Sequence, residues 1–513
     1  MSITYQAPYP AQDAPKIGVV YNSIGGFVEQ GKQLTETAFG KLLDQCKSSG
    51  VISADSVIYP DRIFGAHDAW KVADLFSTSG LDAIVIVNSA FPCGHVLPII
   101  GMAPHLRHLP LVVAAYEEPN EPLQSCLWVT NAICGSDMNK HDARRLGRYA
   151  RYLAGQPGSE DFDNEFGMLM NVYRCVRKLS RTYVGRFGDG PGGFHSATGD
   201  QLLFARVFGV AVETVDLLRV YRVFEEMTTT GTAGEASFSD EDIRATVAEM
   251  LGGRVNLMQG SDDLYRSARL YHALRAICRA EGFTAASLKC WPEIMQPPLS
   301  LSGCLPIAWA TAKGDVAGFA CEGDWPGAVL QAAAHWLSGR PAAFLDFVDW
   351  TAKSDVVRFG HCGVGLAGCM APNDPALVAR IEADGGVTEQ LREEIVAGQL
   401  TVNDAINYPH NIPGKIAGHI GQFEYGPKTG IDLIQTAEGG LEMLAFEGES
   451  APDTARGVLY AGCDMRIPRY KALDEIKRTR GFSHHLVVAL KHILPELQEL
   501  CAYYGIDLVT PGA

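Results

Sequence analysis

The sequence has 513 residues, of which 47% are hydrophobic and 20% are charged, and its formal net charge is −16. This length exceeds one compact domain and predicts roughly three units of about 150 residues each. An acidic surface repels phosphate backbones and anionic membranes, so we expect no nucleic-acid partner and no membrane partner.

The first segment alternates apolar runs with helix-compatible stretches. The runs KIGVVYN, DAIVIVNSA and LPLVVAAY occupy residues 16–22, 82–90 and 109–116, and a helix-like stretch covers 31–49. Continuous Val/Ile-rich runs are typical of parallel strands covered on both faces, and their alternation with helices predicts a doubly wound sheet. The loops NSIGGF and NSAFPCGH follow two of these strands, where α/β proteins bind ligands. No G-x-G-x-x-G follows a strand, which argues against a dinucleotide site.

A stretch rich in Gly, Pro and acidic residues, 153–165, predicts the first domain boundary. A second α/β pattern follows, with strands in RTYVGRFG and VAVETVDL and a helix in SATGDQLLFARVFG. Two further helices begin at acidic residues and end at Gly, and FTAASLKCWPE is predicted to be a strand that ends at Pro292.

From about residue 340 the pattern changes to short strands and Gly-rich loops, as in FLDFVDW, VRFGHCGVGLAG and GIDLIQTAEGG. We expect a β-rich region with long loops available for function. The predicted architecture is α/β, with two doubly wound Rossmann-like domains at 1–160 and 161–338 followed by a β-rich domain at 339–513.

The cysteines and the N-terminal residues indicate a cellular compartment. The thirteen Cys are scattered singly, with no C-x-x-C pair, which favours free thiols in a reducing environment. The first residues lack a basic region followed by an apolar run, and no stretch reaches the roughly 18 apolar residues of a membrane span. We therefore expect a soluble, cytoplasmic protein.

Two stretches place carboxylates where chemistry is expected. In CEGDWPGAVLQAAAHW, Glu322 and Asp324 precede a predicted helix, and a capping role alone would explain acids there. Glu322, however, lies where a strand meets that helix, the edge at which α/β proteins bind ligands. Asp346 lies inside the apolar strand AAFLDFVDW, between Phe344 and Val348 on one face. Such an acid either points to solvent or is paired or metal-bound, because burying an unpaired charge is costly. Since its face is apolar, solvent exposure is the weaker explanation.

Histidines are the second kind of candidate ligand. His484 and His485 form a pair at the start of the predicted last helix, His361 lies in a Gly-rich loop, and His410 follows a Pro. Each of them alone is more often structural than functional. One His together with two carboxylates makes a set suited to Mn²⁺ and compatible with Mg²⁺ or Co²⁺.

The segment CEGDWPGAVLQAAAHWLSGRPAAFLDF resembles the core of the L-fucose and L-arabinose isomerases. In that family a Glu-x-Asp at a strand–helix junction precedes a metal-binding Asp in a strand, and the positions of Glu322 and Asp346 match this pattern. FSHHLVVALKH resembles the late segment that carries the family's metal-binding His, which implies His485, with His492 where another His is frequent. The loop NSIGGFVEQG lacks the arginines that fucose isomerases carry after their first strand, so the sugar is left open.

The resemblance implies a Mn²⁺-dependent aldose–ketose isomerase that assembles as a trimer or hexamer. It assigns Glu322 and Asp346 as both ligands and acid–base pair, with His485 as the third ligand. Asp324 is expected to be a helix cap or a partner of a ligand.

Further residues are candidates for contact with the sugar. SLKCWPE and TGDQLLFARVFG resemble family segments that imply substrate contacts for Lys289 and Asp200. For Lys289 a surface ion pair explains the residue equally well. His361 is expected either to contact substrate, to take the fourth ligand position of the arabinose isomerases, or to be structural. Trp325, like Trp291, is a candidate to stack on the sugar, and core packing explains it equally well.

Two alternatives to an isomerase stay open on the sequence. A metal-dependent epimerase or retro-aldol lyase would use the same carboxylates and the same enediolate. A non-catalytic sugar-binding protein would use the cleft between two α/β domains and would need no metal ligands.

Overall fold

The computed structural model describes residues 5–119, 129–231, 234–258, 262–350, 354–407, 417–455 and 460–512. Its contacts separate two compact units, one formed by Met1–Lys178 with Gln498–Gly505 and the other by Leu179–Leu497 with Ile506–Ala513. The second unit holds both the segment predicted as a second α/β domain and the β-rich segment. His410 lies outside the described residues.

The first unit is built on a parallel sheet with the strand order β2-β1-β3-β4-β5. Its strands are β1 (Ile17–Asn22), β2 (Val57–Ile63), β3 (Ala83–Asn88), β4 (Leu111–Tyr116) and β5 (Arg151–Gly155). Every residue of β3 is buried, as its Val/Ile-rich sequence predicts for a strand covered on both faces. The three apolar runs predicted as strands in this segment are confirmed.

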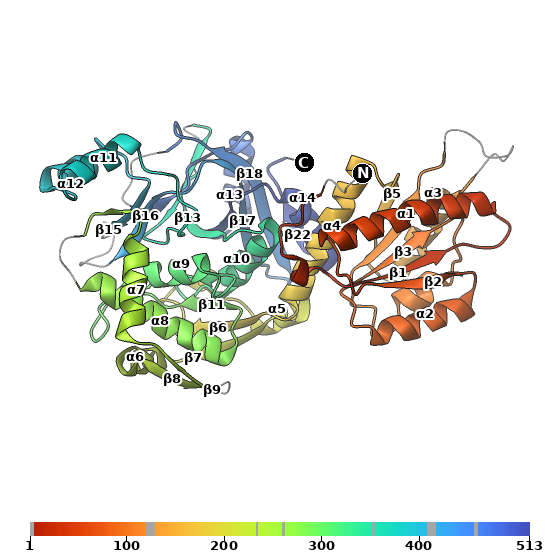
Figure 1. Ribbon diagram of the computed structural model, residues 1–513, viewed down its shortest axis with the longest axis horizontal. Helices are drawn as coiled ribbons and strands as arrows, with labels where there is room; N and C mark the ends of the chain where they lie inside the picture. Colours follow the sequence, from red (N-terminus) through yellow and green to blue (C-terminus); the bar gives the residue numbers. More distant parts are fainter. Residues whose placement is uncertain are drawn as a thin grey trace. The chain divides into compact units, whose positions relative to one another are not determined.

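Helices cover both faces of this sheet (Figure 1). They are α1 (Glu29–Ser49), α2 (Ala66–Thr78), α3 (Ala132–Arg145) and α4 (Glu160–Leu179). Phe76 of α2 packs with Ile84 and Ile86 of β3 in one cluster, whereas Phe39 of α1 meets Phe162 of α4 edge to face. The predicted doubly wound arrangement is therefore confirmed here.

The second unit contains a smaller parallel sheet with the order β12-β11-β6-β7. The strands are β6 (Tyr183–Phe187), β7 (Ala211–Val215), β11 (Ala285–Leu288) and β12 (Phe319–Ala320). The helices of this segment are α5 (Gln201–Phe208), α6 (Leu217–Glu226), α7 (Asp240–Leu251), α8 (Asp263–Glu281), α9 (Cys304–Ala312) and α10 (Trp325–Ser338). β8 (Thr228–Gly231) and β9 (Gly234–Ser237) form a separate hairpin. β11 ends four residues before Pro292, so the predicted strand end is wrong.

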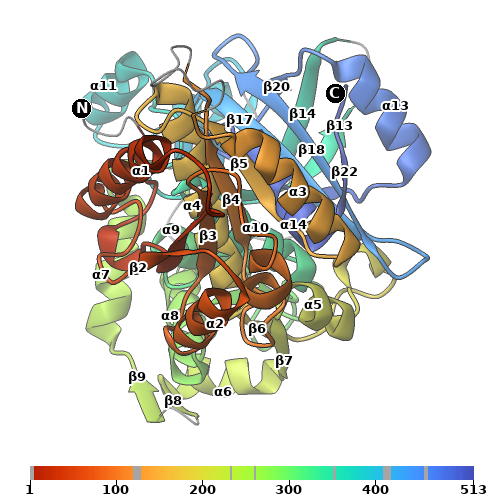
Figure 2. The ribbon, with the colours of Figure 1, turned by 90° about the vertical axis from the view of Figure 1, so that its right-hand side faces the viewer.

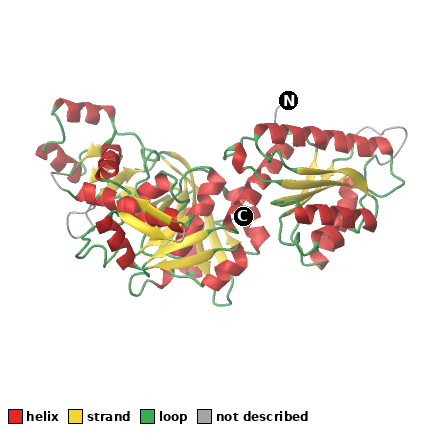
Figure 3. Cartoon of the chain, turned by 60° about the horizontal axis from the view of Figure 1, so that its bottom comes forward, coloured by secondary structure: helices red, strands yellow, loops and turns green. Residues whose placement is uncertain are grey.

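Among the described residues, the other sheet of this unit is mixed and eleven-stranded, which confirms the β-rich prediction (Figures 2 and 3). Its order along the main path is β10-β15-β16-β19-β14-β13-β21-β17-β18-β20, and β22 pairs with β18. The strands are β10 (Val255–Asn256), β13 (Ala343–Asp349), β14 (Val356–His361), β15 (Asp404–Asn407), β16 (Gly418–Gln422), β17 (Gly426–Gln435), β18 (Leu441–Ser450), β19 (Ala461–Gly462), β20 (Met465–Arg466), β21 (His485–Ala489) and β22 (Asp507–Val509). The helices of this segment are α11 (Pro375–Ala383), α12 (Glu389–Val396) and α13 (Tyr470–Arg480). Helix α14 (Leu494–Tyr504) follows, and its residues from Gln498 on belong to the first unit.

Helix α10 connects the two sheets of the second unit. It contacts β11 and β12 of the parallel sheet and β21 and β17 of the mixed sheet, and it lies between β11 and β17 in Figure 1. Nearly all of its side chains are buried, which explains why its sequence is apolar all round rather than along one stripe. Its N-terminus therefore delivers Glu322 and Asp324 to the place where the two sheets meet.

The prediction that His484 and His485 open the last helix is wrong. His485 begins strand β21, which is buried throughout and lies between β13 and β17. The β-branched pair Val487–Val488 favours this strand. Among the described residues, no helix has both the length and the apolar character needed to cross a bilayer.

Candidate functional site

Glu322 is presented by a tight backbone turn between β12 and α10. Its φ is +58° and that of Gly323 is +69°, so both residues lie in the left-handed region. A non-glycine residue there costs about 1–2 kcal/mol, and such strain concentrates at functional sites. A Cβ on Gly323 would come within 2.7 Å of the Asp189 carbonyl oxygen, so the backbone path leaves room only for Gly.

Asp324 has two roles. Its Oδ1 accepts a hydrogen bond from the backbone N–H of Gly327 at 2.7 Å, which confirms the predicted helix cap. Its Oδ2 lies 2.8 Å from Nδ1 of His485, and both side chains are buried. A carboxylate that accepts from Nδ1 fixes the ring orientation and directs Nε2 toward any ligand in front of it.

Glu322 and Asp346 meet at that Nε2 atom. Oε2 of Glu322 lies 3.0 Å from it and Oδ1 of Asp346 lies 3.6 Å from it. The antiparallel pairing of β13 with β21 places Asp346 directly opposite His485. The three residues predicted as metal ligands are therefore neighbours, although Glu322 and His485 are 163 positions apart in the chain.

The face of β13 that carries Asp346 opens to solvent. Phe344 is buried, but Val348 on the same face is 50% exposed, so the apolar residues of this face do not exclude solvent as expected. About a third of the Asp346 side chain is exposed, at 34%, whereas only 14% of Glu322 is. A small molecule can therefore reach the group from the Asp346 side.

The charges of this group stabilise one another. Burial raises the pKa of Glu322, but the hydrogen bond from His485, together with His361 and Trp291, outweighs it and lowers the pKa to about 2. Burial lowers the pKa of His485, but its hydrogen bonds to Asp324 and Glu322 outweigh it and raise the pKa to about 10. Without a metal ion, an imidazolium thus lies among three carboxyl groups.

His361 closes the group from β14. It is 4% exposed, and its Nε2 has no hydrogen-bond partner among the described residues. One potential ligand atom each from Asp346, His361 and His485 lies within 4.8 Å of the other two. A buried, unpartnered ring nitrogen beside a carboxylate and a second imidazole is compatible with a fourth metal ligand.

An aromatic wall borders the group on another side. Nε1 of Trp291 donates to Oε1 of Glu322 at 2.9 Å, and Phe194 lies edge-on to both Trp291 and His484. The His484 and His485 rings are 4.0 Å apart between centroids. Phe194 was not predicted, because the loop GPGGFHSA carries no pattern that relates it to Glu322.

The remaining predicted residues are placed less centrally. Nζ of Lys289 forms an ion pair with Glu293 at 2.7 Å, just beyond the end of β11. Asp200 caps α5, where Oδ1 accepts from the backbone N–H groups of Leu202 and Leu203. Trp325 is 1% exposed and packs edge-on against Phe204, which leaves no ring face for a sugar in this structure.

A cavity of about 620 Å³ adjoins the group. His485 and Asp324 line it, whereas Glu322, Asp346 and His361 are not among its lining residues. Asp200 and Asp432 also line the cavity, and its lining among the described residues contains no Lys or Arg. The volume suits a monosaccharide, and a lining without Lys or Arg favours hydroxyl groups over anions.

No protein-family model matches the chain. Two relatives that do match it carry the name of a sugar-converting enzyme, an isomerase. A sulfoquinovose isomerase from Alkalicoccus urumqiensis is 22% identical over 434 residues, which are 83% of this chain and 86% of that protein. A protein of the same name from Clostridium sp. (strain MSTE9) is 25% identical over 235 residues, 45% of this chain and 49% of its own length. The chain is thus similar to sugar isomerases, and its relation to the L-fucose and L-arabinose isomerases stays a prediction.

Proposed function

We propose that this chain is an aldose–ketose isomerase of a monosaccharide that works with a divalent cation held by Glu322, Asp346 and His485. Mn²⁺ is the first candidate, with Mg²⁺ and Co²⁺ as alternatives. The observation that carries the proposal is the meeting of both carboxylates at Nε2 of His485, at 3.0 and 3.6 Å, from three separate elements. The names of the two relatives support the reaction class.

The donor set fits such a cation. Two carboxylates and an imidazole are hard-to-borderline ligands, and His361, which has a ligand atom within 4.8 Å of Asp346 and of His485, offers a further donor. A divalent cation bound here would polarise the sugar carbonyl and balance the negative charge of the enediolate.

The two carboxylates are suited to moving a proton between neighbouring carbons. Glu322 is held by Trp291 at one oxygen and by His485 at the other, so its position and its charge are both defined. Asp346 is the more exposed of the pair and faces the open side of the group. We assign to this pair the removal of the proton at one carbon and its return at the next.

Asp324 and the aromatic wall would orient these groups. Asp324 holds Nδ1 of His485 and so keeps its Nε2 directed at the carboxylates. Trp291 and Phe194 shield one side of Glu322 from water. Lys289 and Asp200 remain our proposed contacts for sugar oxygens.

Sulfoquinovose, a 6-deoxyglucose with a sulfonate on C6, is the first substrate to test, because both relatives carry its name. The lining of the cavity among the described residues contains no Lys or Arg that would pair with a sulfonate. We therefore place the sulfonate end of such a sugar on the open Asp346 side and not in the cavity.

The test is a panel of sulfonated and unmodified aldoses and ketoses in D₂O with added Mn²⁺, followed by NMR. The proposal predicts the rearranged sugar with deuterium at C1 or C2. An aldose inverted at C2 would indicate an epimerase, and shorter fragments would indicate a lyase. Tight sugar binding by a metal-free protein without turnover would indicate a binding protein.

Glu322→Gln supplies the matched variant. It keeps the size of the side chain but removes the charge, so turnover should fall by at least about a thousandfold while circular dichroism stays that of the wild type. Near-wild-type isomerisation by this variant would overturn the assignment. We also propose a trimer or hexamer, which light scattering measures directly.

A further inference from the structure

The cavity beside the candidate site has an exposed rim and a buried interior. Asp200 and Gln435 line the rim, and both are exposed. Asp324, Asp432 and His485 line the interior and are at most 4% exposed. All of the described residues that line the cavity belong to the second unit. A ligand can therefore enter from solvent and reach buried polar groups.

Asp432 of β17 lines the cavity with an incomplete set of hydrogen bonds. The backbone N–H of Ser483 bonds to its carboxyl group, but Oδ2 has no hydrogen-bond partner among the described residues. Asp324, by contrast, uses both oxygens, one for the N–H of Gly327 and one for the ring of His485. A buried carboxyl oxygen without a partner costs stability, so we expect a bound ligand to supply the missing hydrogen bond.

The rest of the lining combines polar groups with apolar carbon. Ser196 and Thr198 carry hydroxyl groups and Gln435 carries an amide, whereas Leu330 and Phe344 supply apolar surface. A sugar presents hydroxyl groups, each of which can donate and accept, together with apolar C–H groups. Because the described lining contains no Lys or Arg, it fits an uncharged polyhydroxyl group better than an anion.

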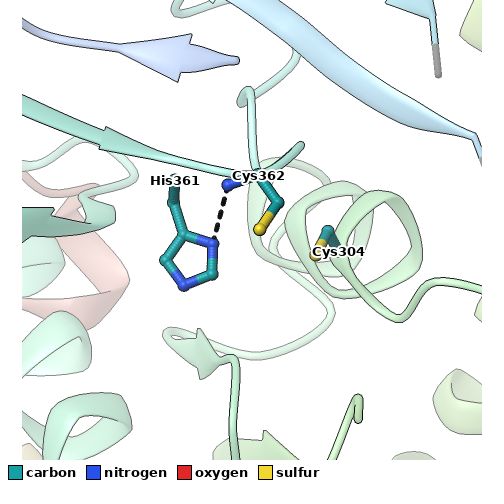
Figure 4. A group of neighbouring side chains, drawn as sticks. All are labelled: Cys304, His361 and Cys362. Carbon is teal, nitrogen blue, oxygen red and sulfur yellow. Dashed lines mark hydrogen bonds between the residues drawn. The ribbon is translucent and has the colours of Figure 1, made fainter. Parts of the chain in front are cut away.

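The opposite side of the carboxylate group, at His361, is filled by the protein itself. Figure 4 shows His361 beside Cys304 and Cys362, and its Nδ1 accepts a hydrogen bond from the backbone N–H of Cys362 at 2.9 Å. None of these three residues lines the cavity. Among the proposed metal ligands His485 does line it, so the cavity and the cation site meet at this residue. A sugar at the cation therefore has room on the cavity side.

We propose that the cavity holds the hydroxyl groups of the sugar that take no part in the proton transfer, and that Asp432 is the specificity-determining residue for one of them. The inference rests on the proposed function, because it places the reacting carbons at the cation. Oδ2 of Asp432 pairs with one hydroxyl group of the bound sugar. A sugar that lacks this hydroxyl leaves the buried carboxyl without a partner and is therefore rejected.

The first test measures binding without turnover. The full chain, stripped of metal, is titrated by calorimetry with sorbitol, mannitol and galactitol, which carry the hydroxyl groups of a hexose but no carbonyl. We expect at least one of them to bind, and Asp432→Leu to weaken that binding at least about tenfold. Asp432→Asn should stay within about threefold of the wild type, because an amide also pairs with a hydroxyl. Asp464→Asn changes another buried carboxyl of this unit, outside the cavity, and should bind like the wild type.

The second test measures selectivity with the aldose that the D₂O panel identifies and with its 3-deoxy and 4-deoxy derivatives. The wild type should turn over one of the two derivatives with a kcat/KM at least about a hundredfold below that of the parent sugar. Asp432→Leu should lose most of this discrimination, because it has no carboxyl group to leave unpartnered. A purely structural role of Asp432 would lower kcat/KM for all three sugars by the same factor.

Three results would overturn the proposal. One is a wild-type chain that binds none of the three hexitols, and another is a folded Asp432→Leu variant that binds them as the wild type does. The third is a hexitol that binds but does not compete with the aldose in turnover, since it would then occupy a different place from the sugar. Hexitol binding that depends on Asp432 in a chain without isomerase activity would support the cavity assignment and overturn only the proposed reaction.

Discussion

Asp324→Asn separates the two roles of one carboxylate. The asparagine keeps an oxygen for the backbone N–H of Gly327, so the cap of α10 is retained. Its amide NH₂ then faces Nδ1 of His485, where Oδ2 now lies at 2.8 Å. Two donors cannot pair, so the imidazole has to move its proton to Nε2, the atom that faces Glu322 and Asp346.

The size of the effect follows from this contact. A hydrogen bond that involves charged groups contributes about 1.5–3 kcal/mol, and 1.4 kcal/mol corresponds to a factor of ten. Loss of a carboxylate behind a metal-binding histidine typically costs about 10–100-fold in affinity or activity, which is the same range. We therefore expect Asp324→Asn to weaken Mn²⁺ binding and to lower kcat/KM by about thirtyfold.

Two further variants make the measurement specific. Asp324→Ala also removes the cap and should cost about 1 kcal/mol more in unfolding free energy. Asp216→Asn changes the cap of α6, where Oδ1 accepts from Leu218, and should leave turnover unchanged. Mn²⁺ affinity is measured by calorimetry on the metal-free protein, and turnover by NMR. Asp324→Asn with wild-type Mn²⁺ affinity and turnover would refute the reasoning.

Three other predictions follow from the same region. His361→Asn removes the imidazole beside Asp346 and His485 and should weaken Mn²⁺ binding about tenfold, as measured by calorimetry. An unchanged Mn²⁺ affinity would exclude His361 as a ligand. Burial raises the pKa of Asp432 to about 7, above the ordinary carboxyl value of about 3.9. The unfolding free energy of the wild type should therefore fall as the pH rises from about 3.9 to about 7, because the unfolded chain loses this proton first. Urea unfolding measures the unfolding free energy of the wild type and of Asp432→Asn. The difference in favour of Asp432→Asn should grow by about 3 kcal/mol from about pH 5 to pH 8, and a difference that does not vary with pH would contradict this. A Cβ on Gly327 would lie 2.5 Å from the ring of Phe344, which is tilted against the His485 ring at 4.7 Å between centroids. Gly327→Ala should therefore lower the unfolding free energy by about 1–3 kcal/mol and lower turnover. A melting curve like that of the wild type would show that the Phe344 ring moves aside without cost.

Local patterns predict much of this fold and part of the site. Continuous Val/Ile runs identify the covered strands of the first unit, because only burial on both faces favours such sequences. Glu322 and Asp346 are identified by their positions at a strand–helix junction and inside an apolar strand. The misplacement of His485 arose because a short apolar run preceded by polar residues fits a helix and a strand equally well.

The contacts that organise the site are not local. Asp324 meets His485 across 161 positions because β21 packs against α10, and no pattern in either segment records this packing. The contacts of Cys321 with Cys290 and Cys304 are similarly hidden, since the three residues lie on separate segments with no paired spacing. Such groups can be recognised only in the folded structure, where the ends of several strands lie next to one another.

The position of β21 has a consequence for how the chain acquires this site during synthesis. This strand, His485–Ala489, lies between β13 and β17 in the sheet but follows both of them in the chain, so it leaves the ribosome after them. Until it arrives, β13 and β17 each expose an unpaired edge, and unpaired strand edges are aggregation-prone. The same strand brings His485 to Glu322 and Asp346, so the closing of the sheet and the completion of the site are one event. A chain that stops before β21 is therefore left with open strand edges as well as without its histidine ligand.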